Sequence, residues 1–229
     1  MTFYKVFGRI IIVSIIMIIV GCSNEETLHE STGGNEEIKT GGALNIGYST
    51  QPNSLDPHLS SESANTIVTR NIFETLVVKD SNEAVHPMLA ESFEQSDDGK
   101  TLTFILREGV QFHNGNEMKA EDVVASMNNW LKHSSSGKPF GEATFVELDE
   151  YTVEITLEEP LSTALVAMSR VHNYPAIMPA EIIEEADAEG ISEYIGTGPF
   201  KFEEWKQDQY LKLTKYEDYQ ARSEPADGL

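Results

Sequence analysis

The chain has 229 residues, 40% of them hydrophobic and 9% aromatic, which is enough to bury the core of one large or two modest domains. Its net charge of −22 repels phosphate backbones, so nucleic acid is excluded as an expected partner. Cys22 is the only cysteine. Neither a disulfide nor a cysteine-based zinc site can therefore form within the chain.

The first residues have the layout of an export signal. Lys5 and Arg9 precede an apolar run, Ile10–Val20, that only Ser14 interrupts. This run is shorter than the ~20 residues that a membrane-spanning helix needs. We interpret residues 1–21 as a signal peptide, with an uncleaved anchor or a buried helix as the alternative.

The lone cysteine directly follows the predicted signal peptide. The stretch "IVGC", residues 19–22, resembles a bacterial lipobox, which implies that Cys22 is lipidated and becomes the mature N-terminus. Cleavage there would remove two positive charges and leave a net charge of −24. Lipidation with more than one acyl chain anchors a protein stably. Residues 22–41 are polar, acidic and without apolar periodicity, which predicts a flexible tether on the extracytoplasmic face of the membrane.

The next segments predict a strand, a loop and a helix. Residues 43–49, "ALNIGYS", read as a strand, and the two prolines of "QPNSLDPH" exclude a helix after it. A helix is expected to begin at Ser63 as its N-cap. Its predicted inward side chains are Ile67, Ile72, Phe73 and Leu76.

The middle of the chain gives its clearest patterns. Alternating apolar residues predict strands over Thr101–Glu108 and Tyr151–Glu159, the first preceded by a turn at Asp97–Gly99. Residues 119–133 predict a helix with acidic residues in its first turn. Its apolar stripe comprises Ala120, Val123, Val124, Met127, Trp130 and Leu131. A loop is expected over residues 134–141.

The last part of the chain mixes both kinds of element. Helices opened by proline are expected over residues 160–170 and 179–190, and strands over residues 199–207 and 209–217. Strands and helices alternate without a repeat, so the class is α/β or α+β. Two further blocks predict backbone geometry: "LREGVQFHNG" a short strand between two tight turns, and "GTGPF" glycines at positive φ or at a close backbone approach.

The order of these blocks resembles the oligopeptide/nickel-type solute-binding proteins of ABC importers, family 5 of the extracytoplasmic solute-binding proteins. The matching stretches lie in family order between residues 41 and 205. They are "GGALNIGYSTQPNSLDPH", "IFETLV", "PMLAESFEQSDDGKTLTFILREGVQFHNG", "KAEDVVASM", "YTVEITLEEP", "AIMPAE" and "IGTGPFKFEEW".

The resemblance implies a periplasmic-binding-protein-like α/β fold of type II, in which two lobes close over a ligand. Mapped on this chain, it places an incomplete lobe I at residues 42–76 and 171–229 and an inserted subdomain at residues 77–170, with the second lobe missing. It implies a monomer without cofactor or catalysis, which delivers a peptide-like solute or a nickel chelate to ABC permease subunits. The alternatives are a peptide-signal receptor on the same fold and a fragment that binds nothing.

Polar residues after the first predicted strand are the first candidates for solute binding, because open α/β sheets place ligands at the carboxyl ends of their strands. These residues are Tyr48, Ser49, Thr50 and Gln51. A second group, in "SRVHNYPAIMP", comprises Arg170, His172 and Tyr174, for which the alternative is a place at the hinge or on the surface.

Other reactive residues show no pattern that indicates chemistry. The six histidines lack metal-ligand spacing, and no metal site is expected; His113 is interpreted as structural, and Trp130 and Trp205 as packing residues. No GxSxG, P-loop, GxGxxG or cysteine nucleophile occurs, so the chain is expected not to be an enzyme. An extracellular hydrolase remains the alternative that an activity assay would test.

Overall fold

The computed structural model describes residues 41–222, of which residues 41–46 belong to one unit and residues 47–222 to another. The predicted signal peptide, Cys22 and nearly all of the tether lie outside the described residues. In the first unit, residues 41–46 have no regular secondary structure, and Leu44 and Ile46 are 85% and 75% exposed. The predicted strand over residues 43–49 is wrong, because a strand needs a neighbour for its backbone groups and none of the described strands pairs with this segment.

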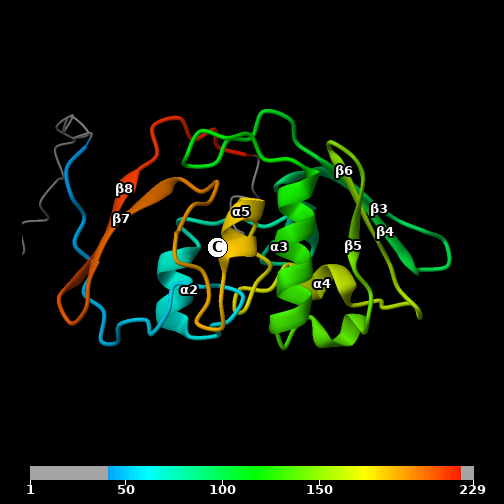
Figure 1. The fold of residues 1–229 in the computed structure, drawn as a ribbon, viewed down its shortest axis with the longest axis horizontal. Coiled ribbons are helices and arrows are strands. Elements are labelled where there is room, and N and C mark those ends of the chain that lie inside the picture. The colour runs from blue at the N-terminus through cyan, green and yellow to red at the C-terminus, as the bar shows by residue number, and fades with distance from the viewer. Residues whose placement is uncertain (1–40, 223–229) are drawn as a thin grey trace, which may run out of the picture. The chain divides into compact units, whose positions relative to one another are not determined.

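The second unit is described over residues 47–222 and mixes short helices with antiparallel strands (Figure 1). In chain order the elements are α2 (Ser63–Thr69), β1 (Val77–Lys79), β2 (Val85–Pro87), β3 (Ala90–Gln95), β4 (Thr101–Leu106), α3 (Ala120–His133), the 3₁₀ turn η1 (Lys138–Phe140), β5 (Phe145–Asp149), β6 (Thr152–Thr156), α4 (Ala164–Met168), α5 (Ala180–Glu185), β7 (Phe200–Lys206) and β8 (Tyr210–Lys215).

A four-stranded antiparallel sheet in the order β3-β4-β6-β5 organises the middle of the unit. The predicted strands around residues 101–108 and 151–159 are confirmed as β4 and β6, paired so that Phe104 faces Val153 and Leu102 faces Ile155. All four of these side chains are fully buried, as the alternating pattern requires. Gly99, with φ of +72°, completes the predicted turn between β3 and β4.

Helix α3 confirms the predicted helix over residues 119–133 and packs against β5 and β6. Its apolar stripe is buried at Val123, Met127 and Trp130. The Asp122 carboxylate accepts the Lys119 N–H at 2.9 Å, which satisfies an N-terminal donor of the helix. It also accepts the Ala180 N–H at 2.8 Å and so joins α3 to the start of α5.

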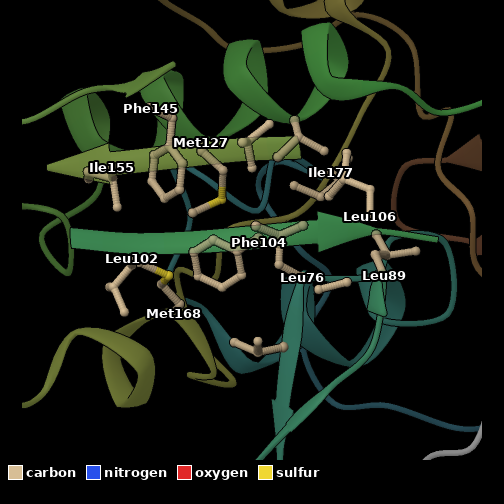
Figure 2. Packing of buried hydrophobic residues seen from close by; sticks show 14 of the residues in the cluster. Leu76, Leu89, Leu102, Phe104, Leu106, Met127, Phe145, Ile155, Met168 and Ile177 are labelled. Atoms are coloured by element: carbon tan, nitrogen blue, oxygen red, sulfur yellow. The ribbon is translucent and has the colours of Figure 1, made fainter. Parts of the chain in front are cut away.

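The first core cluster lies between this sheet, α3 and α4. Figure 2 shows Phe104 in its middle, with Met127 and Phe145 on one side in this view and Leu76 on the other. The rings of Phe93 and Phe145 lie 6.1 and 6.2 Å from that of Phe104, centroid to centroid, in tilted arrangements. The cluster gathers buried side chains between residues 76 and 177.

A second core cluster is built from residues 72–73 and 174–191. Its buried members are Ile72, Phe73, Tyr174, Ala176, Met178, Ile182 and Ile191. The two strands predicted over residues 199–207 and 209–217 are confirmed as β7 and β8, which pair as an antiparallel hairpin, and Phe202 and Leu213 pack against this cluster. The core thus changes from one cluster to the other between residues 73 and 76 and again between residues 168 and 174, after which only Ile177 belongs to the first cluster.

Helix α2 differs from its prediction in length, cap and buried face. It ends at Thr69, and Glu62 rather than Ser63 is its N-cap. Ile67 is 50% exposed, whereas Asn65 and Thr69 are buried and hydrogen-bonded. The apolar residues Ile72, Phe73 and Leu76 are buried beyond the helix, so the helical spacing that included them was accidental.

The other predicted elements are present but shorter. Helix α4 begins at Ala164, four residues after Pro160, and α5 spans Ala180–Glu185 with Pro179 as its N-cap. In the "LREGVQFHNG" block, both predicted turns occur, with Gly109 and Gly115 at positive φ. The predicted short strand between them amounts to a single bridge between Gln111 and Glu117. Within residues 41–222, no helix is both long enough and apolar enough to span a bilayer.

Candidate functional site

The first group of predicted solute contacts lies in an exposed loop beside the β7–β8 hairpin. Tyr48 is 53% exposed, and Ser49, Thr50 and Gln51 are exposed as well. The Gln51 amide fixes the loop, because its Nε2 donates to Asp208 Oδ1 at 3.2 Å and its Oε1 accepts the Asp208 N–H at 2.8 Å. Tyr48, Ser49 and Thr50 thus have exposed side chains, whereas the Gln51 amide is engaged with Asp208.

The second group lies between α2 and the C-terminal end of α3. Arg170 is exposed and donates from Nη1 to Ser136 Oγ at 3.2 Å. His172 is also exposed, and its Nδ1 lies 2.9 Å from Thr66 Oγ1. Arg170 carries a positive charge on a chain whose net charge is −22.

Tyr174 belongs to the protein interior instead. It is 1% exposed, and its hydroxyl donates to Thr69 Oγ1 at 2.9 Å. Burial raises the pKa of this hydroxyl far above its usual value. Tyr174 therefore fixes the segment from the protein interior, and only Arg170 and His172 of this group remain candidates for solute contacts.

The loop that carries "LDPH" is held by a buried carboxylate. Asp56 is 2% exposed and accepts three backbone N–H groups, from His58 at 2.8 Å, Leu59 at 3.3 Å and Ile191 at 3.2 Å. Gly190 adopts φ of +105°, and a Cβ there would lie 2.7 Å from the Asp56 carboxylate. The close approach of the two chains thus requires glycine.

His58 links this loop to α3 and to the segment after Tyr174. Asn129 Nδ2 donates to His58 Nδ1 at 2.9 Å, so the ring proton is on Nε2, which donates to the Ala176 carbonyl at 2.9 Å. Complete burial lowers the pKa of His58, against the opposing effect of Asp56. His58 is therefore a neutral, structural histidine.

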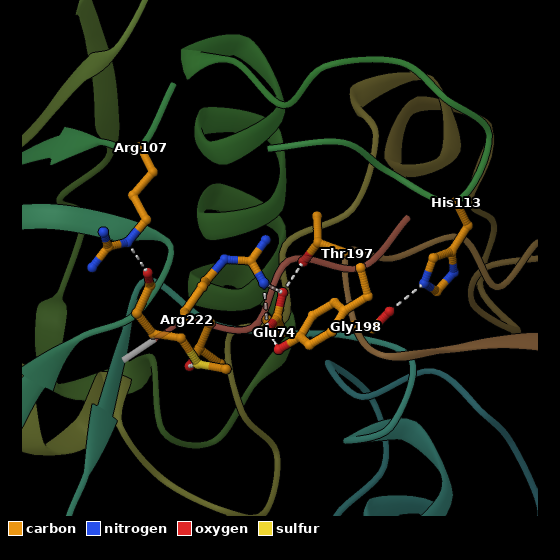
Figure 3. A network of polar contacts seen from close by, with 9 residues as sticks. Glu74, Arg107, His113, Thr197, Gly198 and Arg222 are labelled. Atoms are coloured by element: carbon orange, nitrogen blue, oxygen red, sulfur yellow. Dashed lines mark hydrogen bonds and ion pairs between the residues drawn. The ribbon is translucent and has the colours of Figure 1, made fainter. Parts of the chain in front are cut away.

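A second buried polar centre surrounds Glu74 (Figure 3). Its carboxylate accepts Arg222 Nη1 at 2.7 and 2.5 Å, Thr197 Oγ1 at 2.7 Å and the Tyr219 hydroxyl at 3.0 Å. The side chains of Glu74 and Arg222 are only 2% and 9% exposed. This ion pair joins the segment before β1 to the end of the described chain.

A hollow of about 380 Å³ opens next to Arg222. Arg107 also lines it and donates from Nε to the Met88 carbonyl at 2.7 Å. The exposed carboxylates of Glu91, Glu108 and Asp218 stand in the same wall. The mixed charges define no single ligand chemistry, and we treat this hollow as part of the scaffold.

The contacts of His113, near the Glu74 centre, agree with its interpretation as a structural residue. Gly196 N–H donates to its Nδ1 at 3.3 Å, and its Nε2 donates to the Gly198 carbonyl at 2.9 Å (Figure 3). Burial lowers the pKa of this imidazole. The glycines of "GTGPF" are needed for close approach rather than for positive φ, because a Cβ on Gly196 would lie 2.1 Å from the Ile72 carbonyl oxygen.

One residue that sequence reasoning missed is Asn173, which lies between the predicted His172 and Tyr174. It is 7% exposed and adopts a left-handed φ of +52°. An asparagine before a Tyr-Pro pair carries no strong signal in a single sequence. Among residues 41–222, no three His, Cys, Asp or Glu side chains are grouped so as to hold a metal ion.

The described residues thus form a mixed helix and strand scaffold on which the candidate residues lie in two exposed segments. Residues 84–228 match the family model of the bacterial extracellular solute-binding proteins, family 5, middle region. The chain therefore belongs to this family.

Individual relatives agree with this assignment. The glutathione-binding protein GsiB of Salmonella paratyphi A is 30% identical over 171 residues, which make up 72% of this chain and 33% of the relative. The oligopeptide-binding protein AppA from Bacillus subtilis, solved with a nonapeptide, is 27% identical with a TM-score of 0.64, over 74% of this chain and 35% of AppA. NikZ from Campylobacter jejuni, solved with Ni(L-His), is 28% identical with a TM-score of 0.64, over 74% of this chain and 34% of NikZ.

The chain spans about a third of the length of these relatives. Its fold is that of the corresponding part of a periplasmic binding protein.

Proposed function

We propose that this chain provides the first lobe and the inserted subdomain of an extracytoplasmic solute-binding protein that delivers its solute to the permease of an ABC importer. The observation that carries the proposal is the family match over residues 84–228. The proposed solute is peptide-like or a related compound such as a nickel chelate, in line with the names of the relatives. The proposed role is binding by a monomer without covalent chemistry.

The proposed division of the chain assigns residues 42–76 and 171–229 to lobe I and residues 77–170 to the inserted subdomain. The two core clusters support it, because all buried members of the second cluster lie within residues 72–73 and 174–191, whereas the first cluster runs from Leu76 to Met168 and takes only Ile177 from the later segment. An insertion that packs its own core is expected to fold as a subdomain of its own.

The proposed solute contacts are Tyr48, Ser49, Thr50 and Gln51 in one loop and Arg170 and His172 in the other. Arg170 uses one guanidinium nitrogen for Ser136, and its remaining N–H groups can pair with a carboxylate in two parallel hydrogen bonds. Peptides and glutathione carry such a carboxylate. We therefore assign Arg170 to an acidic group of the solute.

A binding screen tests the proposal. Glutathione, a nonapeptide and the Ni(II)–L-histidine complex are titrated into the mature protein as the cell makes it, with calorimetric detection. Binding of at least one compound is expected, and Arg170→Gln should weaken it about tenfold or more, which corresponds to the loss of one charged hydrogen-bonded pair. Lys212→Gln, a change at an exposed ion pair on β8, is the matched control and should bind as the wild type does. Equal affinity of the Arg170 variant and the wild type would contradict the assignment.

We also propose that Cys22 carries a lipid that holds the protein on the extracytoplasmic face of the membrane. The lipobox-like stretch before Cys22 and the acidic tether after it support this. The mass of the native protein extracted from membranes should exceed that of the polypeptide beginning at Cys22 by the mass of the acyl chains. Cys22→Ser should lack this added mass, and an unmodified Cys22 in the wild type would contradict the proposal.

A further inference from the structure

Three segments that are far apart in the sequence meet at Asn173. They are the "LDPH" loop around His58, the residues after α3 from Ser134 to Ser136, and the segment from Arg170 to Tyr174. The proposed solute contacts Arg170 and His172 lie on the third of these. The contacts that fix this segment therefore determine the positions of the Arg170 and His172 side chains.

The Asn173 side chain uses both ends of its amide. Its Nδ2 donates to the His58 carbonyl at 2.6 Å. Its Oδ1 accepts the Ser134 hydroxyl at 2.6 Å and the Ser135 N–H at 3.1 Å. This one buried amide therefore connects all three segments.

The Asn173 backbone makes a separate set of contacts. Its carbonyl accepts the indole N–H of Trp130 at 2.8 Å, from the fully buried ring on α3. Its left-handed φ of +52° reverses the chain between His172 and Tyr174. As a result His172 is exposed beside Thr66 and Tyr174 is buried against Thr69.

We propose that Asn173 is a positioning residue for solute binding: its side-chain amide holds the segment with Arg170 and His172 against the end of α3 and the "LDPH" loop. This rests on the proposed function of that segment. Asparagine suits the position because it tolerates the left-handed conformation and also offers a donor and an acceptor. Glycine would satisfy the first requirement alone.

The test compares Asn173→Gly with Ser126→Ala. The glycine variant keeps the backbone turn and removes the amide. Ser126 is a buried hydroxyl on α3 that donates to the Met178 carbonyl at 3.0 Å and accepts its N–H at 2.9 Å, so its loss also removes buried hydrogen bonds, at a site outside the three segments. Both variants are expected to unfold at a lower temperature than the wild type.

Affinity is then measured with glutathione, the nonapeptide and Ni(II)–L-histidine, well below the unfolding temperature of either variant. We expect Asn173→Gly to raise the Kd about tenfold and Ser126→Ala to leave it unchanged. A purely structural role of Asn173 predicts no difference in Kd between the two variants, and that result would overturn the proposal.

A measurement without solute separates this proposal from the proposed function. In Asn173→Gly, amide hydrogen exchange should accelerate at least tenfold over residues 134–137 and 170–174, while the middle of α3 remains as protected as in the wild type. If no compound of the screen binds the wild type, the proposed function fails for these compounds, and the exchange result still decides whether the Asn173 amide holds these two segments in place. Unchanged exchange in these two segments would refute it.

Discussion

Replacing Glu74 by glutamine should destabilise the protein strongly, because it breaks the buried pair with Arg222. The glutamine keeps the shape of the side chain but presents an N–H₂ group where one carboxylate oxygen accepts two donors. At Oε2 these donors are Thr197 Oγ1 at 2.7 Å and Arg222 Nη1 at 2.5 Å. The Arg222 charge, on a side chain that is only 9% exposed, would then lack its partner.

The magnitude follows from how far each partner can reach water. Removing one partner of a buried ion pair costs about 3–5 kcal/mol. Arg222 borders the open hollow and can turn toward solvent, so we expect the lower value, about 3 kcal/mol, for Glu74→Gln. Arg222→Met should cost at least as much, because Glu74 is 2% exposed and has no such escape.

Urea denaturation of both single variants and the double variant measures these costs. The double variant should lose clearly less stability than the two single variants added together, because the pair is removed as a unit. Glu204→Gln, at an exposed pair with Lys206, is the control and should change the free energy of unfolding by less than about 0.5 kcal/mol. A loss below about 1 kcal/mol for Glu74→Gln, or strictly additive costs, would refute the reasoning.

Three further predictions concern other parts of the scaffold. Burial lowers the pKa of His58, so as the pH falls the unfolded state binds the imidazole proton before the folded state does, and the free energy of unfolding should decrease below about pH 6.5. His58→Gln should reduce this dependence of stability on pH in denaturation experiments. An unchanged pH dependence in the variant would contradict the prediction. Gly196→Ala would place a Cβ 2.1 Å from the Ile72 oxygen and should cost about 1–3 kcal/mol or more in the same assay, whereas Gly47→Ala, where a Cβ meets nothing within 4 Å, should be neutral. Phe104→Ala removes a fully buried ring from the first core cluster and should cost about 3–5 kcal/mol; a melting temperature close to that of the wild type would contradict its central place.

Strong periodicity made the middle of the chain predictable. Helix α3 and strands β4 and β6 lie where the spacing of their apolar residues placed them, because each has one buried and one exposed face. Strands β7 and β8 were also predicted, but their pairing as a hairpin comes from the structure. In such segments the spacing of the apolar residues matches the period of the helix or strand whose one face is buried.

The wrong predictions concern segments whose structure depends on contacts with distant parts of the chain. Residues 43–49 have the composition of a strand, but none of the described strands pairs with them. Helix α2 buries Asn65 and Thr69 and exposes Ile67, because Asn65 donates to the Ser54 carbonyl and Thr69 accepts the Tyr174 hydroxyl. Local propensity contains no information about such distant groups.

The sequence by itself determined the acidic character, the central helix and strands, and the resemblance to family 5, and it is the sole basis of the proposed lipidation of Cys22. Only the tertiary structure separated the exposed Arg170 and His172 from the buried Tyr174 and revealed Asn173 as the junction beneath them. The physical reason is that burial and hydrogen bonding at this site depend on three segments from distant parts of the chain. Their meeting is a property of the folded molecule, and a single sequence shows only that each contains polar residues.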